Sequence, residues 1–383
     1  MDAENFSWLG RKPDTLKYHL NHPDVDPEAY ARKRRIEFGQ QLMSMRRIYF
    51  DTNHWIHWRD VLMERPRTTS HKQIFARLKD LRQKNRVVCP VSYSVYSELM
   101  RQSDDATRKA TARAIDLLAG GACIQPPDEV FRQEVLYFLQ RTTTPGLDLH
   151  PVAEMVWTKA AFILGDRFLQ VPQLPKDLES ALTKAMDDLC WGIGLEELIS
   201  VLPVGSPAEE SASLNQFATD LTLGKKNAAK DSDTFDELFQ QEVAGGLEPY
   251  NNLLGELMLY VCSTFGFNGQ PSIDDKSQAG GALRNLICQA FRFKKVSIEL
   301  PSIHIHAGLH AALRFEKPRA YKPGDCEDFR HAAAALPYYD TFCTDRSLKL
   351  LLCHKLLRYD QAYSTVIVSD DEEIIALVDE VEG

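Results

Sequence analysis

The stretch RRIYFDTNHW, residues 46–55, decides the fold class, because a short apolar run within it ends in an acidic residue. Runs of this length and composition are typical of buried β-strands. Similar runs occur at residues 338–345 (YYDTFCTD) and 364–370 (STVIVSD), which also end in acids, and at residues 87–92 (VVCPVS). A helical pattern follows each run. This alternation predicts an α/β domain with a parallel sheet sandwiched by helices.

The strand–helix alternation occupies two separate parts of the chain. We expect it over residues 46–125 and again over residues 321–383, with an N-terminal extension at residues 1–45. Between the two parts, residues 126–320 hold long amphipathic helical patterns, such as VAEMVWTKAAFILGDRFLQ at residues 152–170, and almost no strand signal. The sequence therefore predicts one α/β domain that is interrupted by an all-helical inserted subdomain.

The composition is that of an ordinary soluble protein. The chain has 383 residues, of which 44% are hydrophobic and 26% charged. It contains no apolar run long enough to span a membrane, and its first residues lack the apolar core of a signal peptide, so we expect a cytoplasmic protein. A net charge of −9 argues against a chain that coats nucleic acid indiscriminately. The eight cysteines form no CxxC pair, which favours free thiols over a zinc knuckle or a disulfide framework.

Acidic residues follow the predicted strands. Asp51 and Asp345 each stand at the end of an apolar run, Glu98 lies early in a helix after a second run, and Asp328 is expected to open the helix before Asp345. Sites in parallel α/β sheets form at the carboxyl ends of the strands. Carboxylates gathered there would repel one another unless cations neutralise them, and hard oxygen ligands favour Mg²⁺ or Mn²⁺. Each acid taken alone is better explained as a helix cap, so the prediction of a site depends on the four acids occurring together in one topology.

The same residues resemble a known family. RRIYFDTNHW is similar to the first motif of PIN domains, VVCPVSYSVYSELM (residues 87–100) to the second, and GDCEDFRHAAAALPYYDTFCTDRSL (residues 324–348) to the third and fourth. The resemblance covers residues 46–125 and 321–383 and does not extend to the segment between them. It implies a PIN-like fold and a Mg²⁺- or Mn²⁺-dependent ribonuclease or other nuclease, of endonuclease or exonuclease type, that cleaves a phosphodiester bond by attack of water on phosphorus.

Carried over to this chain, the resemblance implies that four acids bind the metal and perform catalysis, namely Asp51, Glu98, Asp328 and Asp345. It also implies that Asn53 supports the first acid or contacts phosphate. The gap between the second and third acids is far longer than in a minimal PIN domain. The helical segment is therefore expected to cover, restrict or repurpose the site.

Three further polar residues lie near the motifs. Asp325 is expected either to cap the helix that contains Asp328 or to join the site. Asp340 opens the strand that precedes Asp345, and the odd separation places the two side chains on opposite faces, so Asp340 is a substitute or supporting group. His331 follows Asp328 by one turn and is expected to orient that carboxylate or to be a packed surface histidine.

Basic and aromatic residues near the motifs are candidates for nucleic-acid contacts. Arg59, Arg330 and Arg346 are placed to hold phosphates. Trp55 and Trp58, at i,i+3 spacing, are either core residues or platforms on which bases stack, and the core is the better interpretation. In the segment IHIHAGLH, residues 303–310, three histidines invite a zinc site, but no HExxH motif is present and contact with phosphate is favoured instead.

Two functional hypotheses follow. The intact set of acids favours a nuclease, with RNA as the expected substrate and no membrane partner. The alternative is a non-catalytic module that keeps the fold and binds nucleic acid or protein. Both leave room for a regulatory protein partner or a homo-oligomer. Walker A, GxGxxG and GxSxG motifs are absent, and Asn53 replaces the second acid of a DxD phosphatase motif.

Overall fold

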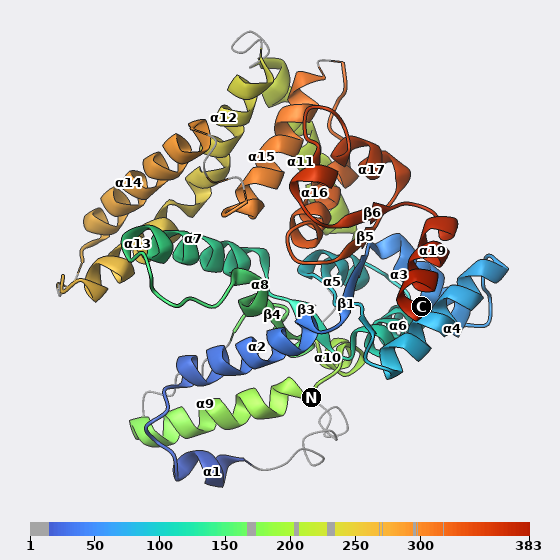
Figure 1. The fold of residues 1–383 in the computed structure, drawn as a ribbon, viewed down its shortest axis with the longest axis horizontal. Helices are drawn as coiled ribbons and strands as arrows, with labels where there is room; N and C mark the ends of the chain where they lie inside the picture. The colour runs from blue at the N-terminus through green and yellow to red at the C-terminus, as the bar shows by residue number, and fades with distance from the viewer. Residues whose placement is uncertain are drawn as a thin grey trace.

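The computed structural model describes residues 15–166, 174–202, 207–227, 234–267, 269, 271–293, 296, 298–316 and 318–383, and at residues 207–211 and 227 it describes the backbone alone. The fold is mostly helical with a small parallel sheet, which confirms the α/β class (Figure 1). No helix in these ranges is both long enough and apolar enough to cross a membrane. All eight cysteines are free thiols, as the spacing predicts.

The main sheet consists of four parallel strands in the order β2-β1-β5-β6. Its strands are β2 (Val87–Val88), β1 (Arg46–Phe50), β5 (Thr341–Cys343) and β6 (Val366–Val368). The two central strands come from the two distant parts of the chain, and Ile48 pairs with Thr341 while Phe50 pairs with Cys343. The parallel sheet therefore exists as predicted, although its strands are shorter than the apolar runs suggest.

The prediction that residues 126–320 are purely helical is wrong. A second, two-stranded antiparallel sheet joins β3 (Ala122–Ile124) to β4 (Trp157–Lys159), and β3 lies beside the main sheet through a bridge between Val91 and Cys123. The segment predicted as one helix from residue 152 instead forms α8 (Val152–Met155), β4 and the short 3-10 helix η3 (Ala160–Phe162) as far as the structure describes it. A strand of three residues is too short to produce the alternating pattern by which strands are recognised.

The helices of the two α/β parts surround the sheet. They are α3 (Thr52–Leu62), α4 (Thr69–Gln83), α5 (Tyr93–Met100), α6 (Asp105–Ala119), α16 (Pro323–Ala335), α17 (Arg346–Leu352), α18 (Tyr359–Ala362) and α19 (Asp371–Glu382). Helix α6 ends at Gly120, which adopts the left-handed conformation that glycine tolerates. Trp55 and Trp58 of α3 are fully buried, which confirms the prediction that they belong to the core.

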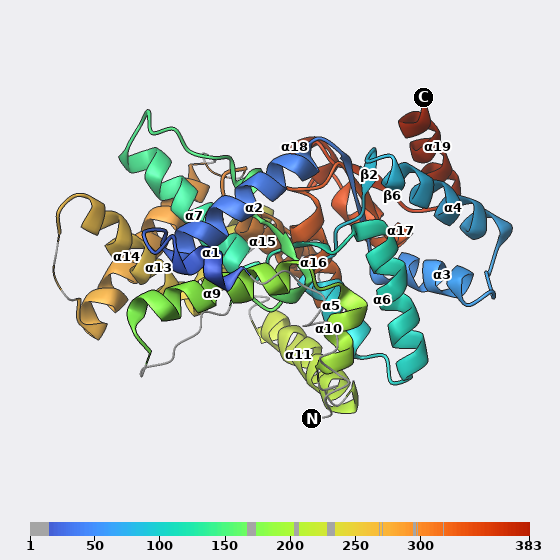
Figure 2. The same cartoon turned by 90° about the horizontal axis from the view of Figure 1, so that it is seen from below.

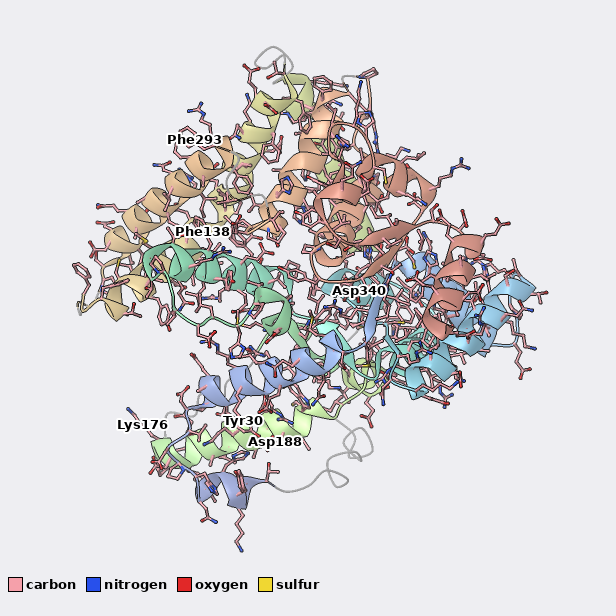
Figure 3. The ribbon with its side chains drawn as sticks, viewed as in Figure 1. Tyr30, Phe138, Lys176, Asp188, Phe293 and Asp340 are labelled. Carbon is pink, nitrogen blue, oxygen red and sulfur yellow. The ribbon has the colours of Figure 1, made fainter. Side chains whose placement is uncertain are left out.

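The N-terminal extension is anchored by a half-buried acid, Asp188. Helices α1 (Leu16–Leu20) and α2 (Pro27–Met43) pack against α9 (Lys176–Trp191). Asp188 of α9 accepts hydrogen bonds from His19 Nε2 at 2.8 Å and from the Tyr30 hydroxyl at 2.6 Å, and Arg34 pairs with it at 2.6 Å. Figure 3 shows Tyr30 and Asp188 between α2 and α9.

The remaining helices form a separate layer on the side of the molecule away from α4 and α19 (Figures 1 and 2). They are α7 (Pro127–Thr143), α12 (Phe235–Leu247), α13 (Asn251–Thr264), α14 (Ile273–Arg292) and α15 (Pro301–Phe315), with the 3-10 helix η4 (Glu248–Tyr250) between α12 and α13. Gly255 and Gly280 let α13 and α14 approach closely, since a Cβ atom at either position would lie about 2 Å from a carbonyl oxygen of the other helix. This layer has its own hydrophobic core.

The segment at residues 126–320 does not pack as one unit. Trp157 and Leu195, the latter at the start of α10 (Leu195–Val201), belong to the main core around the sheet. Leu309 of α15 also packs in that core, whereas Ile303 and Ala307 of the same helix face the core of the helical layer. Helix α15 therefore lies between the two cores. The domain boundaries at residues 125/126 and 320/321 remain a prediction.

Candidate acidic site at the carboxyl edge of the sheet

Asp51 stands at the end of β1 and caps α3. Its Oδ1 atom accepts a hydrogen bond from His54 Nδ1 at 2.8 Å and from the His54 backbone N–H at 3.3 Å. Burial alone would raise the pKa of Asp51, but the interactions with His54 and the charge of His331 outweigh it and hold that pKa below its ordinary value. Asp51 is therefore an oriented, ionised carboxylate. Both bonds go to Oδ1, and the Oδ2 atom has no hydrogen bond with a described residue.

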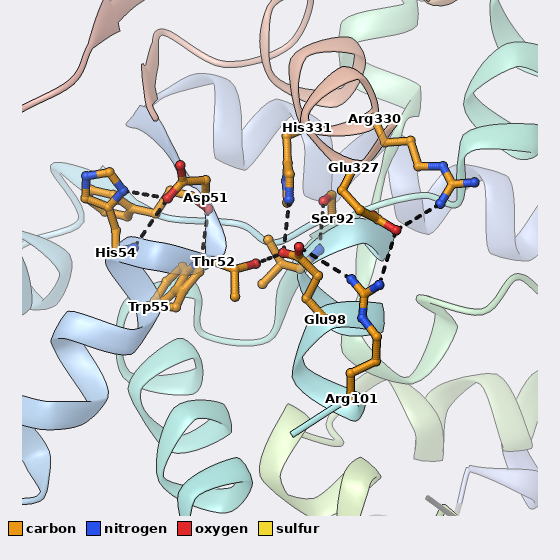
Figure 4. Close-up of polar contacts among 12 residues, drawn as sticks. Asp51, Thr52, His54, Trp55, Ser92, Glu98, Arg101, Glu327, Arg330 and His331 are labelled. Atoms are coloured by element: carbon orange, nitrogen blue, oxygen red, sulfur yellow. Dashed lines mark hydrogen bonds and ion pairs between the residues drawn. The ribbon is translucent and has the colours of Figure 1, made fainter. Parts of the chain in front are cut away.

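Glu98 of α5 is held by residues from three other places in the chain. Its Oε2 atom accepts hydrogen bonds from the Thr52 hydroxyl and from His331 Nε2, the latter at 3.1 Å, and Arg101 lies 3.4 Å from Oε1 (Figure 4). Burial opposes ionisation of Glu98, but the bond to His331 and the neighbouring cations lower its pKa below the ordinary value. The second predicted acid is thus joined to the residue that directly follows the first.

His331 lies at the centre of the acidic cluster. Its Nδ1 atom is 2.5 Å from the Tyr49 hydroxyl, its Nε2 atom bonds Glu98, and the ring is buried. Burial lowers the pKa of His331, but Glu98, Asp51 and Asp328 raise it above its ordinary value. The expectation that His331 orients Asp328 is corrected in one respect, because its hydrogen bond goes to Glu98.

Asp328 has a strongly raised pKa. Burial and the negative charges of Asp345, Asp325 and Asp51 raise its pKa to about 7, against the lowering effect of His331. Asp328 does not open its helix as predicted, because α16 begins five residues earlier at Pro323. Its carboxyl group nevertheless lies close enough to Asp345 and Asp51 for their negative charges to raise its pKa.

Asp345 caps α17 at the end of the β5 segment. Its Oδ1 atom accepts the backbone N–H groups of Ser347 at 2.6 Å and Leu348 at 2.9 Å. As in Asp51, both bonds go to one oxygen, and no hydrogen bond to a described residue engages Oδ2. The helix-cap interpretation and the site interpretation are therefore compatible, because one carboxylate oxygen serves each role.

Electrostatic interactions link three of the four predicted acids, Asp51, Asp328 and Asp345, and His331 connects this group to the fourth, Glu98. Asp328 feels the charges of Asp345 and Asp51, and His331 feels those of Glu98, Asp51 and Asp328. Their hard oxygen atoms suit Mg²⁺ or Mn²⁺, and the pKa of Asp328 indicates too little positive charge among them. Within the described part of the chain, however, no group of three or more histidine, cysteine or acidic side chains is arranged closely enough to hold a metal ion as it stands.

The three other acid-site candidates have different positions. Asn53 is exposed on the first turn of α3. Asp325 caps α16, since its carboxylate accepts the Lys322 backbone N–H at 2.7 Å and pairs with Arg319 at 2.9 Å. Asp340 precedes β5 at the opposite end of the sheet from Asp345, so the expectation that it could replace Asp345 is wrong (Figure 3).

The predicted phosphate-binding arginines are engaged elsewhere or exposed. Arg59 pairs with Asp60 at 2.6 Å, Arg330 pairs with Glu327 at 3.2 Å, and Arg346 is exposed at the start of α17. Arg330 and Arg346 nevertheless lie on the helices that carry Asp328 and follow Asp345.

Sequence reasoning missed four residues of the site, which are Tyr49, Thr52, His54 and Glu327. Thr52 and His54 stand one and three residues after Asp51, which is the spacing at which side chains meet a helix-capping acid. Glu327 is harder to identify from the sequence, and its role becomes visible only in its contacts. It accepts hydrogen bonds from Arg101 and Arg330 on Oε1, while its buried Oε2 has no hydrogen-bond partner among the described residues. Figure 4 shows the resulting chain Glu98–Arg101–Glu327–Arg330.

Comparison with protein-family models, with curated proteins and with solved structures finds no match to this chain.

Proposed function

We propose that this protein is a PIN-type, metal-dependent nuclease that hydrolyses phosphodiester bonds, with RNA as its substrate. The observation that carries the proposal is the state of Asp328, whose pKa of about 7 results from its burial and from the negative charges of Asp345, Asp325 and Asp51. A structural carboxylate is normally placed beside a cation that lowers its pKa. A carboxylate held at the opposite extreme, at the carboxyl edge of a parallel sheet, is typical of a functional site.

The hydrogen bonds around the acids support this proposal. Asp51 and Asp345 each use one oxygen for a helix cap, which fixes the carboxylate and leaves the other oxygen for a ligand. Thr52 and His331 fix Glu98 through its Oε2 atom, whereas its Oε1 atom lies 3.4 Å from Arg101. Asp51, Glu98, Asp328 and Asp345 would hold Mg²⁺ or Mn²⁺, which supplies an activated water and stabilises the phosphate oxygens in an in-line displacement.

His331 has a positioning role in this proposal. Its two N–H groups reach Tyr49 and Glu98, so the ring joins the central strand β1 to α5 through α16. A protonated imidazole in this place offsets part of the negative charge when the site is empty of metal and keeps the Glu98 carboxylate in a single orientation. The residues that bear the metal are therefore braced by groups that need not touch the substrate.

A non-catalytic module that binds nucleic acid or protein is the second candidate. It is favoured by the cations already present, because His331 and Arg101 both contact Glu98, and by the absence of a preformed ligand group among the described residues. In that function the same contacts would stabilise the fold, and the surface of the module would engage a protein partner or a second copy.

The deciding experiment is cleavage of end-labelled RNA and single-stranded DNA with Mn²⁺, with Mg²⁺ and with EDTA. We expect wild-type protein to cleave RNA only with a divalent ion and Asp51→Asn to lose this activity. Asp104→Asn is the matched control, since Asp104 caps α6 outside the cluster and asparagine caps helices equally well. Equal cleavage by wild type and Asp51→Asn contradicts the proposal, and metal-independent binding without cleavage favours the non-catalytic module.

A further inference from the structure

A cavity of about 690 Å³ lies between the α/β part and the helical layer. Its walls come from the start of α5, the β3–α7 connection, α7, α11 (Pro207–Asn227), α12, α15 and α16. Aromatic side chains from several of these elements line it, namely Tyr93, Phe131, Phe217 and Tyr250. This volume lies within the range of sites that bind small molecules, and convergent apolar walls with a few polar groups are typical of them.

Two exposed glycines line the cavity. Gly245 and Gly246 are consecutive residues within α12, both line the cavity, and a Cβ atom added to either would meet no atom within 4 Å. Glycine inside a helix is destabilising by roughly 0.5–1 kcal/mol relative to alanine. Neither position needs glycine to relieve a close contact, unlike Gly255 and Gly280. Their effect is to leave space that larger residues would fill.

Hydrogen bonds of a buried carboxylate, Glu134, fix the elements that form the walls of the cavity. Glu134 of α7 is fully buried and accepts hydrogen bonds from the Ser302 hydroxyl at 2.7 Å, the Ser302 backbone N–H at 3.1 Å and the Tyr338 hydroxyl at 2.7 Å. These bonds tie α7 to the first turn of α15 and to the chain that follows α16. The walls that face each other across the cavity are therefore fixed before any ligand enters, which favours binding.

His306 supplies an unused hydrogen-bonding group on the wall. It is half-buried on α15, lines the cavity, and forms no hydrogen bond with a residue that the structure describes. Burial, with the nearby His310 and Arg330, lowers the pKa of His306 to about 3, so its imidazole is neutral. A neutral imidazole offers one donor and one acceptor. His310 is different, since its Nδ1 already lies 3.1 Å from the Tyr321 hydroxyl.

The charged groups of the wall are balanced within the protein. Glu242 pairs with Arg314 at 2.6 Å, and Arg330 pairs with Glu327 at 3.2 Å. Asp128 accepts a hydrogen bond from the Tyr250 hydroxyl at 3.0 Å. No excess of positive charge faces the cavity, so a polyphosphate group is disfavoured inside it. The lining instead suits an uncharged planar ring with hydrogen-bonding edges.

The cavity and the acidic site share helix α16. Asp328 and His331 face the acids, whereas Arg330 and Ala333 of the same helix face the cavity. Glu327 lies between them, bonded to Arg101 on the side of the acids and to Arg330 on the side of the cavity (Figure 4). Helix α16 and the chain Glu98–Arg101–Glu327–Arg330 therefore connect the acids to the cavity.

We propose that this cavity binds a nucleobase, with the ring packed among the aromatic side chains and its edge hydrogen-bonded to His306. The inference rests on the proposed nuclease function for its biological setting, because the base is then one that an RNA strand splays out beside the acidic site. Aromatic stacking combined with hydrogen bonds to the edge of the base is how proteins recognise unpaired bases. The same chemistry would also accept a free nucleoside.

The test is a binding measurement that requires no cleavage. Asp328→Asn protein, which keeps RNA intact, is titrated with adenosine, guanosine, cytidine and uridine and with single-stranded RNA hexamers of each base, and binding is followed by calorimetry and saturation-transfer NMR. We expect at least one nucleoside to bind. Gly246→Leu, introduced in the same background, should weaken its binding about tenfold or more, since a lost stacking position changes affinity by roughly that factor.

Matched variants separate the cavity from the fold. Gly281→Leu makes the same change in α14, at a position with open space that does not line the cavity, and should leave binding unchanged. Gly246→Ala adds one methyl group and should largely retain binding, whereas His306→Ala should weaken it. Circular dichroism checks that each variant is folded.

The outcomes distinguish the sources of the base and the two proposals. Binding of nucleosides and hexamers, both weakened by Gly246→Leu, supports a cavity that takes a base from a strand. Binding of nucleosides alone supports a site for a free nucleoside. Binding of neither, or binding that Gly246→Leu leaves unchanged, overturns the inference. None of these results depends on cleavage, so failure of the nuclease proposal is recorded separately by the activity assay.

Discussion

The two ends of strand β5 carry acidic residues with opposite environments. At its beginning, Asp340 accepts two hydrogen bonds from the Arg47 guanidinium, at 3.0 and 2.8 Å, and one from the Arg47 backbone N–H at 2.7 Å. Beyond its other end, Asp345 lies near Asp328 and Asp51, and the combined burial and repulsion raise the pKa of Asp328 to about 7. One end holds a neutralised pair and the other a cluster with too little positive charge.

Around β5, position along the strand decides the role of each aspartate more than its residue type does. Asp340 and Asp345 are separated by only five residues. A carboxylate held by a guanidinium in two-pronged geometry has its charge offset inside the protein and needs no ligand. In the acidic cluster, the carboxylates share one imidazolium, and their mutual repulsion raises the pKa of one of them. A divalent cation removes this repulsion when it binds, and the free energy gained is available for binding substrate or metal.

The largest expected effect is a difference in RNA cleavage between variants at the two ends of β5. We expect Asp328→Asn to lower RNA cleavage about a thousandfold, which corresponds to roughly 4 kcal/mol of transition-state stabilisation lost with a metal ligand. Asp340→Asn should leave the cleavage rate of the folded protein within about threefold of wild type. Single-turnover cleavage with Mn²⁺ measures both, and a comparable loss in the two variants would remove the distinction between the ends.

The next effect is a pH dependence of stability that comes from Asp328. Its pKa is raised in the folded state, so the folded protein holds a proton that the unfolded chain has released above about pH 4. The stability that this proton provides is present at low pH and is lost as the pH rises through about 7. The slope is at most about 1.4 kcal/mol per pH unit, so the free energy of unfolding should fall by up to roughly 3 kcal/mol from pH 5 to pH 7.

Urea unfolding in EDTA across this range checks the prediction. Asp51 and Glu98 have lowered pKa values and stay ionised throughout, while His331, with a raised pKa, adds a slope of the same sign. Asp328→Asn should therefore flatten the curve without abolishing its slope, and Asp340→Asn should leave it as steep as in wild type. Mn²⁺ should stabilise the wild type most at the upper end of the range, where Asp328 is ionised. Parallel curves for wild type and Asp328→Asn contradict the assignment.

A smaller effect is expected when the neutralised end is broken. Arg47→Met removes the guanidinium and leaves the half-buried Asp340 carboxylate without its cation, which should cost about 2 kcal/mol of unfolding free energy. Adding Asp340→Asn to this variant should restore part of the loss, because the unpaired charge is then gone. Denaturant unfolding of the two single variants and the double variant gives the coupling energy. Zero coupling would mean that the pair contributes nothing.

The sequence predicted the parts of this comparison that depend on local pattern. The apolar run at residues 47–50 predicted β1, and the apolar run that ends at Asp345 predicted β5, so the parallel sheet followed from the alternation of strands and helices along the chain. The free thiols and the buried Trp55 and Trp58 also followed from their surroundings in sequence. The free thiols and the buried tryptophans need no knowledge of which distant segments meet.

What could not be predicted depends on distant pairing or on very short elements. His331 and Glu98 are 233 positions apart, and only the packing of α16 on α5 brings them together. Strand β4 has three residues, too few to outweigh the helical pattern around it. The start of α16 was recoverable, because Pro323 occupies the first helical position and Asp325 the third, which are favoured places for proline and an acid.

The smallest effect concerns Tyr49, which stands on β1 between the two ends. Its hydroxyl lies 2.6 Å from the Ser92 hydroxyl and 2.5 Å from His331 Nδ1, so Tyr49→Phe leaves one buried N–H of the imidazolium without an acceptor. We expect a loss of about 1 kcal/mol in unfolding free energy and a lower His331 pKa, since the charged ring loses its partner. NMR titration of His331 follows the pKa directly.

The direction of that pKa shift is what distinguishes a positioning role from simple packing. Removing the hydroxyl leaves the ring of residue 49 to pack as before against Phe342, so a purely structural role predicts a loss of stability with an unchanged His331 pKa. If the hydroxyl instead helps to hold the imidazolium against Glu98, the pKa falls and the pH profile of cleavage moves to lower pH with it. Tyr339→Phe is the matched control, because its hydroxyl bonds the Pro90 carbonyl and does not contact His331. A shift in both variants, or in neither, would place Tyr49 among the packing residues of the sheet and leave Glu98 to hold His331 alone.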